Sequence, residues 1–321
     1  MSVASAVIRS AVLMGAVTLS ALAHADHPAS MPRIGVLNVP IEQFLRQGLR
    51  ELGYVEGKNI IIESRRSDGS EQELQSLAAE LVRSKVDVIV TAGSPTARAV
   101  LAATTTVPLV FSAGDPVSTG LVKSLVKPGG NATGVSVLST ELMAKRVDLL
   151  HQIVPRVRRI VCLTNSSNPI GPLQLEEAQK AAHALGIQLI ALDAGVEAEL
   201  DRALQQLSRS SADGFLVSVD LFLMANKSKI TRAVRKARLP AVYPYREYLG
   251  AGTLASYGPD LNETARKLAA YVDKILKGAK PGDLPIEQLS KYELVIDLRA
   301  ARELNIKVPQ ELLYRADEII R

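Results

Sequence analysis

Beyond Pro32, hydrophobic residues fall into short continuous runs that are separated by longer amphipathic stretches. Continuous apolar runs without alternation are typical of strands that are buried on both faces, as in parallel sheets. Ten runs of this kind, rich in Val and Ile, cover residues 34–37, 60–62, 86–90, 109–111, 134–137, 160–163, 187–192, 214–219, 241–243 and 253–256. We therefore expect these runs to form the strands of parallel sheets.

The stretches between the runs carry apolar residues at helical spacing. One such stripe consists of Leu261, Ala265, Leu268, Val272 and Ile275. This spacing is that of a helix with one buried face. The regular alternation of strand and helix predicts an α/β fold with doubly wound, Rossmann-like sheets.

Ten strands are too many for one compact open sheet in a chain of this length. The first series of runs ends near a strong turn at 128–131, Pro-Gly-Gly-Asn, and a second series begins near residue 158. No flexible linker lies between the two series. We therefore expect two lobes, which the chain crosses through ordered strands to form a hinged pair.

Polar residues follow the predicted strands directly. In doubly wound folds, ligands bind beyond the carboxyl ends of the strands. The candidate ligand-binding residues at these positions are Ser94, Pro95, Ser112, Asp115, Asn165, Ser167, Asp220, Tyr243 and Arg246. Hydrogen-bonding side chains and helix N-termini suit a small polar or zwitterionic ligand.

Several of these residues also have a purely structural interpretation. Ser94 can be an N-cap with Pro95 at the first helical position, a role that is compatible with anion binding. Asp115 can cap the next helix. Asp220 follows an apolar strand, where a lone carboxylate needs a partner. That partner is either a ligand ammonium or the start of a helix near Met224.

Arg246 belongs to the one aromatic cluster of an aromatic-poor chain, with Tyr243, Tyr245 and Tyr248. An arginine there can clamp a carboxylate with two hydrogen bonds, and the tyrosines can stack on an organic ligand. The alternative is a surface ion pair with Glu247.

Signatures of catalysis and nucleotide binding are missing from the sequence. It contains no G-x-S-x-G nucleophile elbow, no P-loop and no G-x-G-x-x-G motif. No pair of histidines has metal-ligand spacing, and Cys162 lies in an apolar strand, where it is typical of a small core residue. We therefore expect no catalytic residue, no metal site and no cofactor.

Composition narrows the class of protein further. The 321 residues are 47% hydrophobic and 22% charged, which is typical of a soluble globular protein. The single cysteine excludes an intrachain disulfide and a cysteine-rich zinc site. The net charge is +5, but the charged residues are interspersed without a basic block, so nucleic acid is not an expected partner.

Residues 1–25 have the pattern of a secretory signal peptide. Arg9 provides the positive charge, residues 11–22 form an apolar stretch, and Ala23-His24-Ala25 is an A-x-A cleavage site. The apolar stretch is too short for a membrane-spanning helix, which needs about 20 residues. The sequence thus predicts cleavage between Ala25 and Asp26 and export to a bacterial periplasm.

Several ordered motifs resemble one known family. They are Leu-Gly-Tyr-Val-Glu-Gly-Lys-Asn-Ile at 52–60, Asp-Pro-Val at 115–117, Gly-Leu-Val at 120–122, Lys-Pro-Gly-Gly-Asn-Ala-Thr-Gly at 127–134, Ile-Leu-Lys-Gly-Ala-Lys-Pro at 275–281, Tyr-Glu-Leu-Val-Ile-Asp at 292–297 and Arg-Ala-Asp-Glu at 315–318. The family is that of the ABC-transporter substrate-binding proteins, which includes binders of aromatic amino acids. The resemblance covers essentially the whole chain beyond the signal peptide.

The resemblance implies a type I periplasmic binding protein fold, in which hinge closure traps a ligand between two lobes. By analogy, lobe 1 comprises residues 32–138 plus 252–283 and lobe 2 comprises residues 139–251. Residues 284–321 form a C-terminal segment that crosses the hinge. The loop after the first strand, Asn38-Val39-Pro40, is shorter than the family usually shows, so Asn38 is not counted among the expected contacts.

The resemblance also implies a function. Such a protein captures a small solute, here amino-acid-like and polar, aromatic or zwitterionic. It delivers the solute to an inner-membrane ABC permease that works with a separate ATPase, and it performs no catalysis. Two alternatives remain at this point, namely a ligand-sensing periplasmic adaptor of the same fold and a secreted α/β enzyme.

Overall fold

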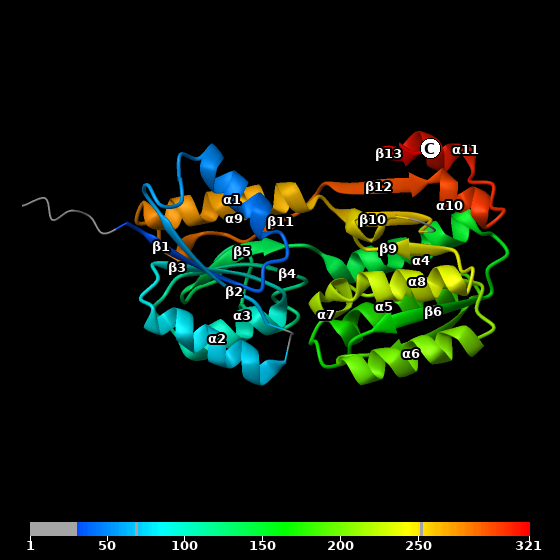
Figure 1. The fold of residues 1–321 in the computed structure, drawn as a ribbon, viewed down its shortest axis with the longest axis horizontal. Coiled ribbons are helices and arrows are strands. Elements are labelled where there is room, and N and C mark those ends of the chain that lie inside the picture. The colour runs from blue at the N-terminus through cyan, green and yellow to red at the C-terminus, as the bar shows by residue number, and fades with distance from the viewer. Residues whose placement is uncertain (1–30, 68–69, 251–252) are drawn as a thin grey trace, which may run out of the picture. The chain divides into compact units, whose positions relative to one another are not determined.

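The computed structural model of the chain describes residues 31–67, 70–250 and 253–321, which form two parallel-stranded sheets with helices on both faces of each (Figure 1). The predicted signal peptide at 1–25 lies outside the described residues. No described helix has the length and hydrophobicity that a membrane crossing requires.

The first sheet has the strand order β11-β5-β4-β3-β1-β2, with all neighbours parallel. Its strands are β1 (Arg33–Leu37), β2 (Ile61–Arg65), β3 (Val88–Ala92), β4 (Leu109–Ala113), β5 (Ala132–Ser136) and β11 (Glu287–Gln288). Helices α1 (Glu42–Glu51) and α9 (Leu261–Leu276) cover one face, and α2 (Glu71–Arg83) and α3 (Ser94–Ala103) cover the other (Figure 1). We call this sheet with its helices the first lobe.

The second sheet has the order β13-β12-β10-β9-β8-β6-β7, and only β10 and β12 are antiparallel. Its strands are β6 (Arg159–Thr164), β7 (Gln188–Asp193), β8 (Gly214–Val217), β9 (Ala241–Tyr243), β10 (Ala255–Pro259), β12 (Tyr292–Asp297) and β13 (Glu318–Ile320). With its helices it forms the second lobe.

The helices of the second lobe follow the same alternation. They are α4 (Ser139–Ile153), α5 (Gly171–Ala184), α6 (Glu197–Arg209), α7 (Leu221–Ala225), α8 (Lys227–Lys236), α10 (Leu298–Glu303) and α11 (Gln310–Arg315), with a 3-10 turn η1 (Arg246–Tyr248). A second 3-10 turn, η2 (Pro281–Asp283), precedes β11 in the first lobe. The predicted α/β fold with two doubly wound sheets is confirmed.

The chain passes between the lobes at three places, after β5, after β10 and after β11. The sequence assigns residues 252–283 to the first lobe, but β10 pairs with β9 and β12 in the second sheet. The chain enters the first lobe only with α9, which packs on α1. The expected boundary itself, at 251–252, lies outside the described residues.

In both sheets the first five strands have the order 2-1-3-4-5. Each sheet therefore has a switch point, which is the place where the strand order reverses. In the first sheet this point lies between β1 and β3, and in the second between β6 and β8. Ligands of doubly wound folds bind outside the carboxyl ends of strands at such points. The residues that follow these four strands are therefore the first place to look for a site.

Candidate functional site

Two adjoining cavities lie where the carboxyl ends of the two sheets meet. The outer cavity has a volume of about 630 Å³ and the inner one about 60 Å³. Residues of both lobes line each cavity, and Asn168, Asp220 and Leu221 line both. The two cavities thus form one site with a shared wall from the second lobe.

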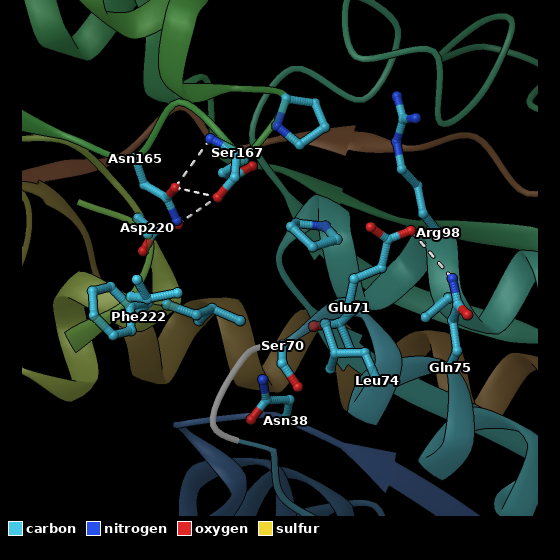
Figure 2. A pocket seen from close by; sticks show the side chains of 18 of the residues that line it. Asn38, Ser70, Glu71, Leu74, Gln75, Arg98, Asn165, Ser167, Asp220 and Phe222 are labelled. Carbon is cyan, nitrogen blue, oxygen red and sulfur yellow. Dashed lines mark hydrogen bonds between the residues drawn. The ribbon is translucent and has the colours of Figure 1, made fainter. Parts of the chain in front are cut away.

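The outer cavity is open and mixed in character. The first lobe contributes Asn38, Ser70, Glu71, Leu74, Gln75, Pro95, Thr96, Arg98, Ala99 and Ala102. The second lobe contributes Asn165, Ser167, Asn168, Pro169, Gly195, Val196, Asp220, Leu221 and Phe222. Figure 2 shows Asn165, Ser167, Asp220 and Phe222 on one side of the cavity and Glu71, Leu74, Gln75 and Arg98 on the other.

Asp220 is the most constrained polar group of this wall. The residue is 8% exposed, and its Oδ2 atom accepts hydrogen bonds from Asn168 Nδ2 at 2.8 Å and Asn165 Nδ2 at 3.1 Å. Its Oδ1 atom accepts from the backbone N–H of Leu223 at 2.9 Å.

No cation among the described residues forms an ion pair with Asp220. Burial raises the pKa of Asp220, while the bonds from Asn168, from the Leu223 backbone and from Asn165 work in the opposite direction. A positively charged ligand group beside this carboxylate would supply the charge partner that the protein does not. Both interpretations of Asp220 from the sequence are compatible, because the residue caps α7 and also lines the cavities.

The inner cavity lies against the start of α3. The sequence pattern predicts Ser94 as the N-cap of α3. This prediction is wrong by one residue, because Gly93 is the N-cap and Ser94 is the first helical residue. The Ser94 hydroxyl therefore makes no capping bond. It is buried and has no hydrogen-bond partner in the described structure, although Ser94 lines the inner cavity. The first turn of a helix also leaves backbone N–H groups free to bind an anion.

Six of the predicted site residues line a cavity. Pro95, Asn165, Ser167 and Asp220 line the outer cavity, and Ser94, Ser112 and Asp220 line the inner one. Asn165 also holds the loop after β6, since its Oδ1 atom accepts hydrogen bonds from the backbone N–H of Ser167 at 3.1 Å and from its hydroxyl at 2.5 Å (Figure 2).

Asp115, Tyr243 and Arg246 line neither cavity. The Asp115 carboxylate accepts hydrogen bonds from the backbone N–H of Thr140, at 3.1 Å, and from the Thr140 hydroxyl. It therefore caps α4, which begins the second lobe. The capping alternative for Asp115 agrees with this geometry, because α4 is the next helix of the chain.

Tyr243 lies in the core instead of the cleft. It is fully buried and stacks on Tyr248, with ring centroids 5.1 Å apart. The reason is that β9 is an interior strand, whose side chains are covered on both faces. Its neighbour Tyr245, beyond the end of the strand, lines the inner cavity.

Arg246 is half-exposed on η1 and points to the edge of the second sheet. Its Nη2 atom lies 2.8 Å from Glu318 Oε2 and its Nη1 atom 3.8 Å from Glu293 Oε2. A surface ion pair was the alternative for this residue, but its partners come from β12 and β13 and not from Glu247.

Most residues that line the outer cavity were not selected from the sequence, among them Asn38, Asn168, Leu221 and Phe222. Asn168 was detectable, because it ends the polar run that follows β6 and contains Asn165 and Ser167. Asn38 follows β1 at the switch point and has a left-handed φ of 54°. No sequence pattern marks Leu221 and Phe222 as ligand-binding residues, because they belong to an apolar helical stretch.

Comparison with known proteins indicates the family of this chain. The profile of the family described as ABC transporter substrate binding protein matches residues 39–320. A tyrosine-binding protein of Clostridioides difficile (strain R20291) is 26% identical over 263 residues, which is 81% of this chain and 75% of that protein.

Solved structures show the same relationship. A conserved domain protein of Vibrio cholerae superposes with a TM-score of 0.84 at 30% identity and covers 90% of this chain and 99% of its own. An ABC domain from Streptococcus pneumonia in complex with L-Trp superposes with a TM-score of 0.83 at 27% identity and covers 91% and 100%. The fold is that of the type I periplasmic binding proteins.

The tyrosine-binding protein and the protein with bound L-Trp are solute binders, and proteins of this family work in the periplasm or outside the cell. The family inferred from the ordered sequence motifs is confirmed, because the profile match spans nearly the whole of the described chain. The chain belongs to the ABC transporter substrate-binding proteins and binds a small solute for an ABC permease.

Proposed function

We propose that the solute is a free amino acid with a large, mainly apolar side chain. The observation that carries this proposal is the position of Asp220, which lines both cavities without an ion-pair partner among the described residues. An α-ammonium group at the boundary of the two cavities would provide a charge partner for this carboxylate. A buried carboxylate of this kind favours a cationic partner strongly.

The α-carboxylate of the same solute has a complementary place in the inner cavity. The start of α3, with its free N–H groups and the unpartnered hydroxyl of Ser94, faces that cavity. The positive end of the helix dipole and these donors favour an anion. A zwitterionic head group would thus bind between the α3 terminus of the first lobe and Asp220 of the second.

The side chain of the solute would extend into the outer cavity. Leu74, Ala99 and Phe222 provide apolar surface there, and Phe222 offers a ring face for stacking. The similarity to a tyrosine-binding protein and to a structure with bound L-Trp supports an aromatic side chain. L-tyrosine and L-tryptophan are therefore the first probes.

The experiment has two parts. The protein is purified from its expression host and denatured, and the released small molecules are identified by mass spectrometry. The refolded protein is then screened by thermal shift against amino acids, aromatic acids, sugars and nucleosides. A solute at about 100 times its dissociation constant adds about 2.7 kcal/mol of stability, which raises the melting temperature by several degrees. We expect shifts with aromatic amino acids; selective shifts with sugars or nucleosides would contradict the proposal.

We propose further that the two lobes close around the solute, with the first lobe boundary near residue 138, as assigned from the sequence, and the second after β10, and that the protein works in the periplasm after removal of residues 1–25. Ligand that contacts both lobes shifts the equilibrium towards the closed form. Small-angle scattering should show a smaller radius of gyration with bound solute, and N-terminal sequencing of the exported protein should begin at Asp26. The protein should also return its solute chemically unchanged, as chromatography of the released solute will show.

A further inference from the structure

Arg146 is the largest fully buried side chain of the described chain, and none of its described neighbours is a carboxylate partner. It lies on α4 in the second lobe, and its Nε atom donates to the carbonyl oxygen of Tyr257 at 2.8 Å. Its Nη1 atom approaches Met143 Sδ at 3.7 Å, and Nη2 has no hydrogen-bond partner among the described residues. A buried cation without an anion is costly, and an apolar side chain of similar size would avoid that cost.

The position of this guanidinium explains what it contributes. Among the described residues, β9 pairs with β10 only at Ala255 and Ser256, and the rest of β10 has no partner strand on that side. Arg146 binds the carbonyl of the next residue, Tyr257, at the point where β9 ends. It therefore replaces a missing sheet contact at the strand that leads directly into α9 of the first lobe.

The same point adjoins the wall of the inner cavity. A Cβ atom on Gly258 would lie 1.7 Å from the Pro244 carbonyl oxygen and 3.8 Å from Arg146 Nη2, so the backbones of the two segments touch beside the guanidinium. The residue after Pro244 is Tyr245, which lines the inner cavity together with Asp220.

Electrostatic interactions also connect Arg146 with the tyrosines near the inner cavity. Burial lowers the pKa of Arg146 to about 10, and the phenol groups of Tyr245, Tyr257 and Tyr248 act in the opposite direction. The guanidinium therefore remains charged at neutral pH. Tyr248, whose buried hydroxyl has no hydrogen-bond partner among the described residues, lies within electrostatic reach of both Arg146 and Asp220.

We propose that Arg146 is a positioning residue of the solute site, which acts from behind the cavity wall by holding the Tyr245 segment and β10 in register. This inference rests on the proposed function for the identity of the solute, but not for the role of the arginine. Arg146 does not line either cavity, so it acts through Tyr245 and not by touching the solute.

The first test needs no solute. Hydrogen exchange is measured in Arg146→Met and in Leu150→Ala, a fully buried residue of the same helix. We expect Arg146→Met to speed exchange at least tenfold more in residues 241–248 and 255–259 than in the rest of the second sheet, whereas Leu150→Ala, which loosens the whole core around α4, does not single out these segments. Unchanged exchange in Arg146→Met would overturn the proposal. If that variant does not fold, Arg146→Lys takes its place, with a smaller increase expected in the same two segments.

The second test is a double-mutant cycle with L-tyrosine as the probe. We expect Arg146→Met to weaken binding at least tenfold in the wild type but less than threefold in a Tyr245→Ala background, because coupled residues are not additive. Arg146→Lys should restore part of the affinity. Equal losses in both backgrounds would mean that Arg146 is merely structural. If L-tyrosine does not bind the wild type, the proposed solute is wrong, and the exchange result still decides the role of Arg146.

Discussion

The side-chain amide of Asn168 donates to Asp220 Oδ2 at 2.8 Å, on the wall that the two cavities share. Asn168 follows β6 and Asp220 follows β8, so the contact joins the two sides of the switch point in the second sheet. The amide orients the carboxylate but carries no charge, and no cation among the described residues pairs with Asp220. This arrangement suits a site that receives a cationic group from a ligand.

Replacing Asp220 with asparagine should abolish the preference of the site for a cationic ligand group. We expect Asp220→Asn to cost about 2–5 kcal/mol of binding free energy for an amino-acid solute, because the ammonium loses its buried charge partner. The dissociation constant then rises about thirtyfold or more, measured by calorimetry. Asp115→Asn is the matched control, since Asp115 caps α4 and lines neither cavity. Equal loss of affinity in the two variants would contradict the role of Asp220.

The stability of the solute-free protein should depend on pH through the same residue. Burial raises the pKa of Asp220 above its unfolded value, so the folded state holds this proton more tightly than the unfolded state does. The resulting stability is present below the unfolded pKa and is lost as the pH rises through the folded pKa. Asp220→Asn has no titrating group at this position. The melting temperature of the variant minus that of the wild type should therefore increase from pH 4 to pH 7. A constant difference over this range would argue against the raised pKa.

Gly93 of the first lobe lies close to Leu221 of the second lobe. It has a φ of 80°, and a Cβ atom there would lie 2.9 Å from Leu221 Cδ1 across the cavities. We expect Gly93→Ala to weaken solute binding about tenfold. The variant should also lose about 1 kcal/mol or more of folding stability, because such a φ is strained for alanine. Leu221→Ala in the same chain should recover part of the affinity by relieving the contact.

Gly278→Ala separates strain from contact. Gly278 has a φ of 96°, and a Cβ atom on it would meet nothing within 4 Å. This variant should lower the melting temperature and leave the affinity for solute as it was. If Gly93→Ala also changes only the melting temperature, Leu221 does not limit closure.

Ser94 should matter for the carboxylate of the solute and not for the fold. Its buried hydroxyl has no partner in the described chain, so Ser94→Ala should leave the stability of the solute-free protein unchanged or slightly increased. We expect affinity for an amino acid to fall by about 1.5–3 kcal/mol, the usual value of a hydrogen bond to a charged group. Ser139→Ala is the control, because that hydroxyl is also buried and unpartnered but lines neither cavity.

Most strands of this fold were predictable because interior parallel strands have a simple composition. Each of the ten apolar runs overlaps a strand from β1 to β10. The exceptions come from the end of the chain. Strands β11 and β13 have only two and three residues, and β12 is an antiparallel strand with a polar start that was recognised as a family motif and not as a strand.

The site was predictable where topology alone decides the position. Asp220 and Asn165 follow β8 and β6 at a switch point, so their place at the cavity follows from strand order. The position of Arg246 depends on the direction of a 3-10 turn after β9 and on partners in β12 and β13. Those partners are distant in the sequence, and no local pattern reveals them.

The most direct measurement is a calorimetric titration of the refolded protein with L-tyrosine and with two analogues, tyramine and 3-(4-hydroxyphenyl)propionate. The first analogue lacks the carboxylate and the second lacks the amine, while the ring is the same. If the head group binds between Asp220 and the start of α3, only L-tyrosine should bind tightly, and each analogue should lose at least about 1.5–3 kcal/mol. Equal affinity for L-tyrosine and the propionate would show that no ammonium reaches Asp220, which would contradict the proposed site.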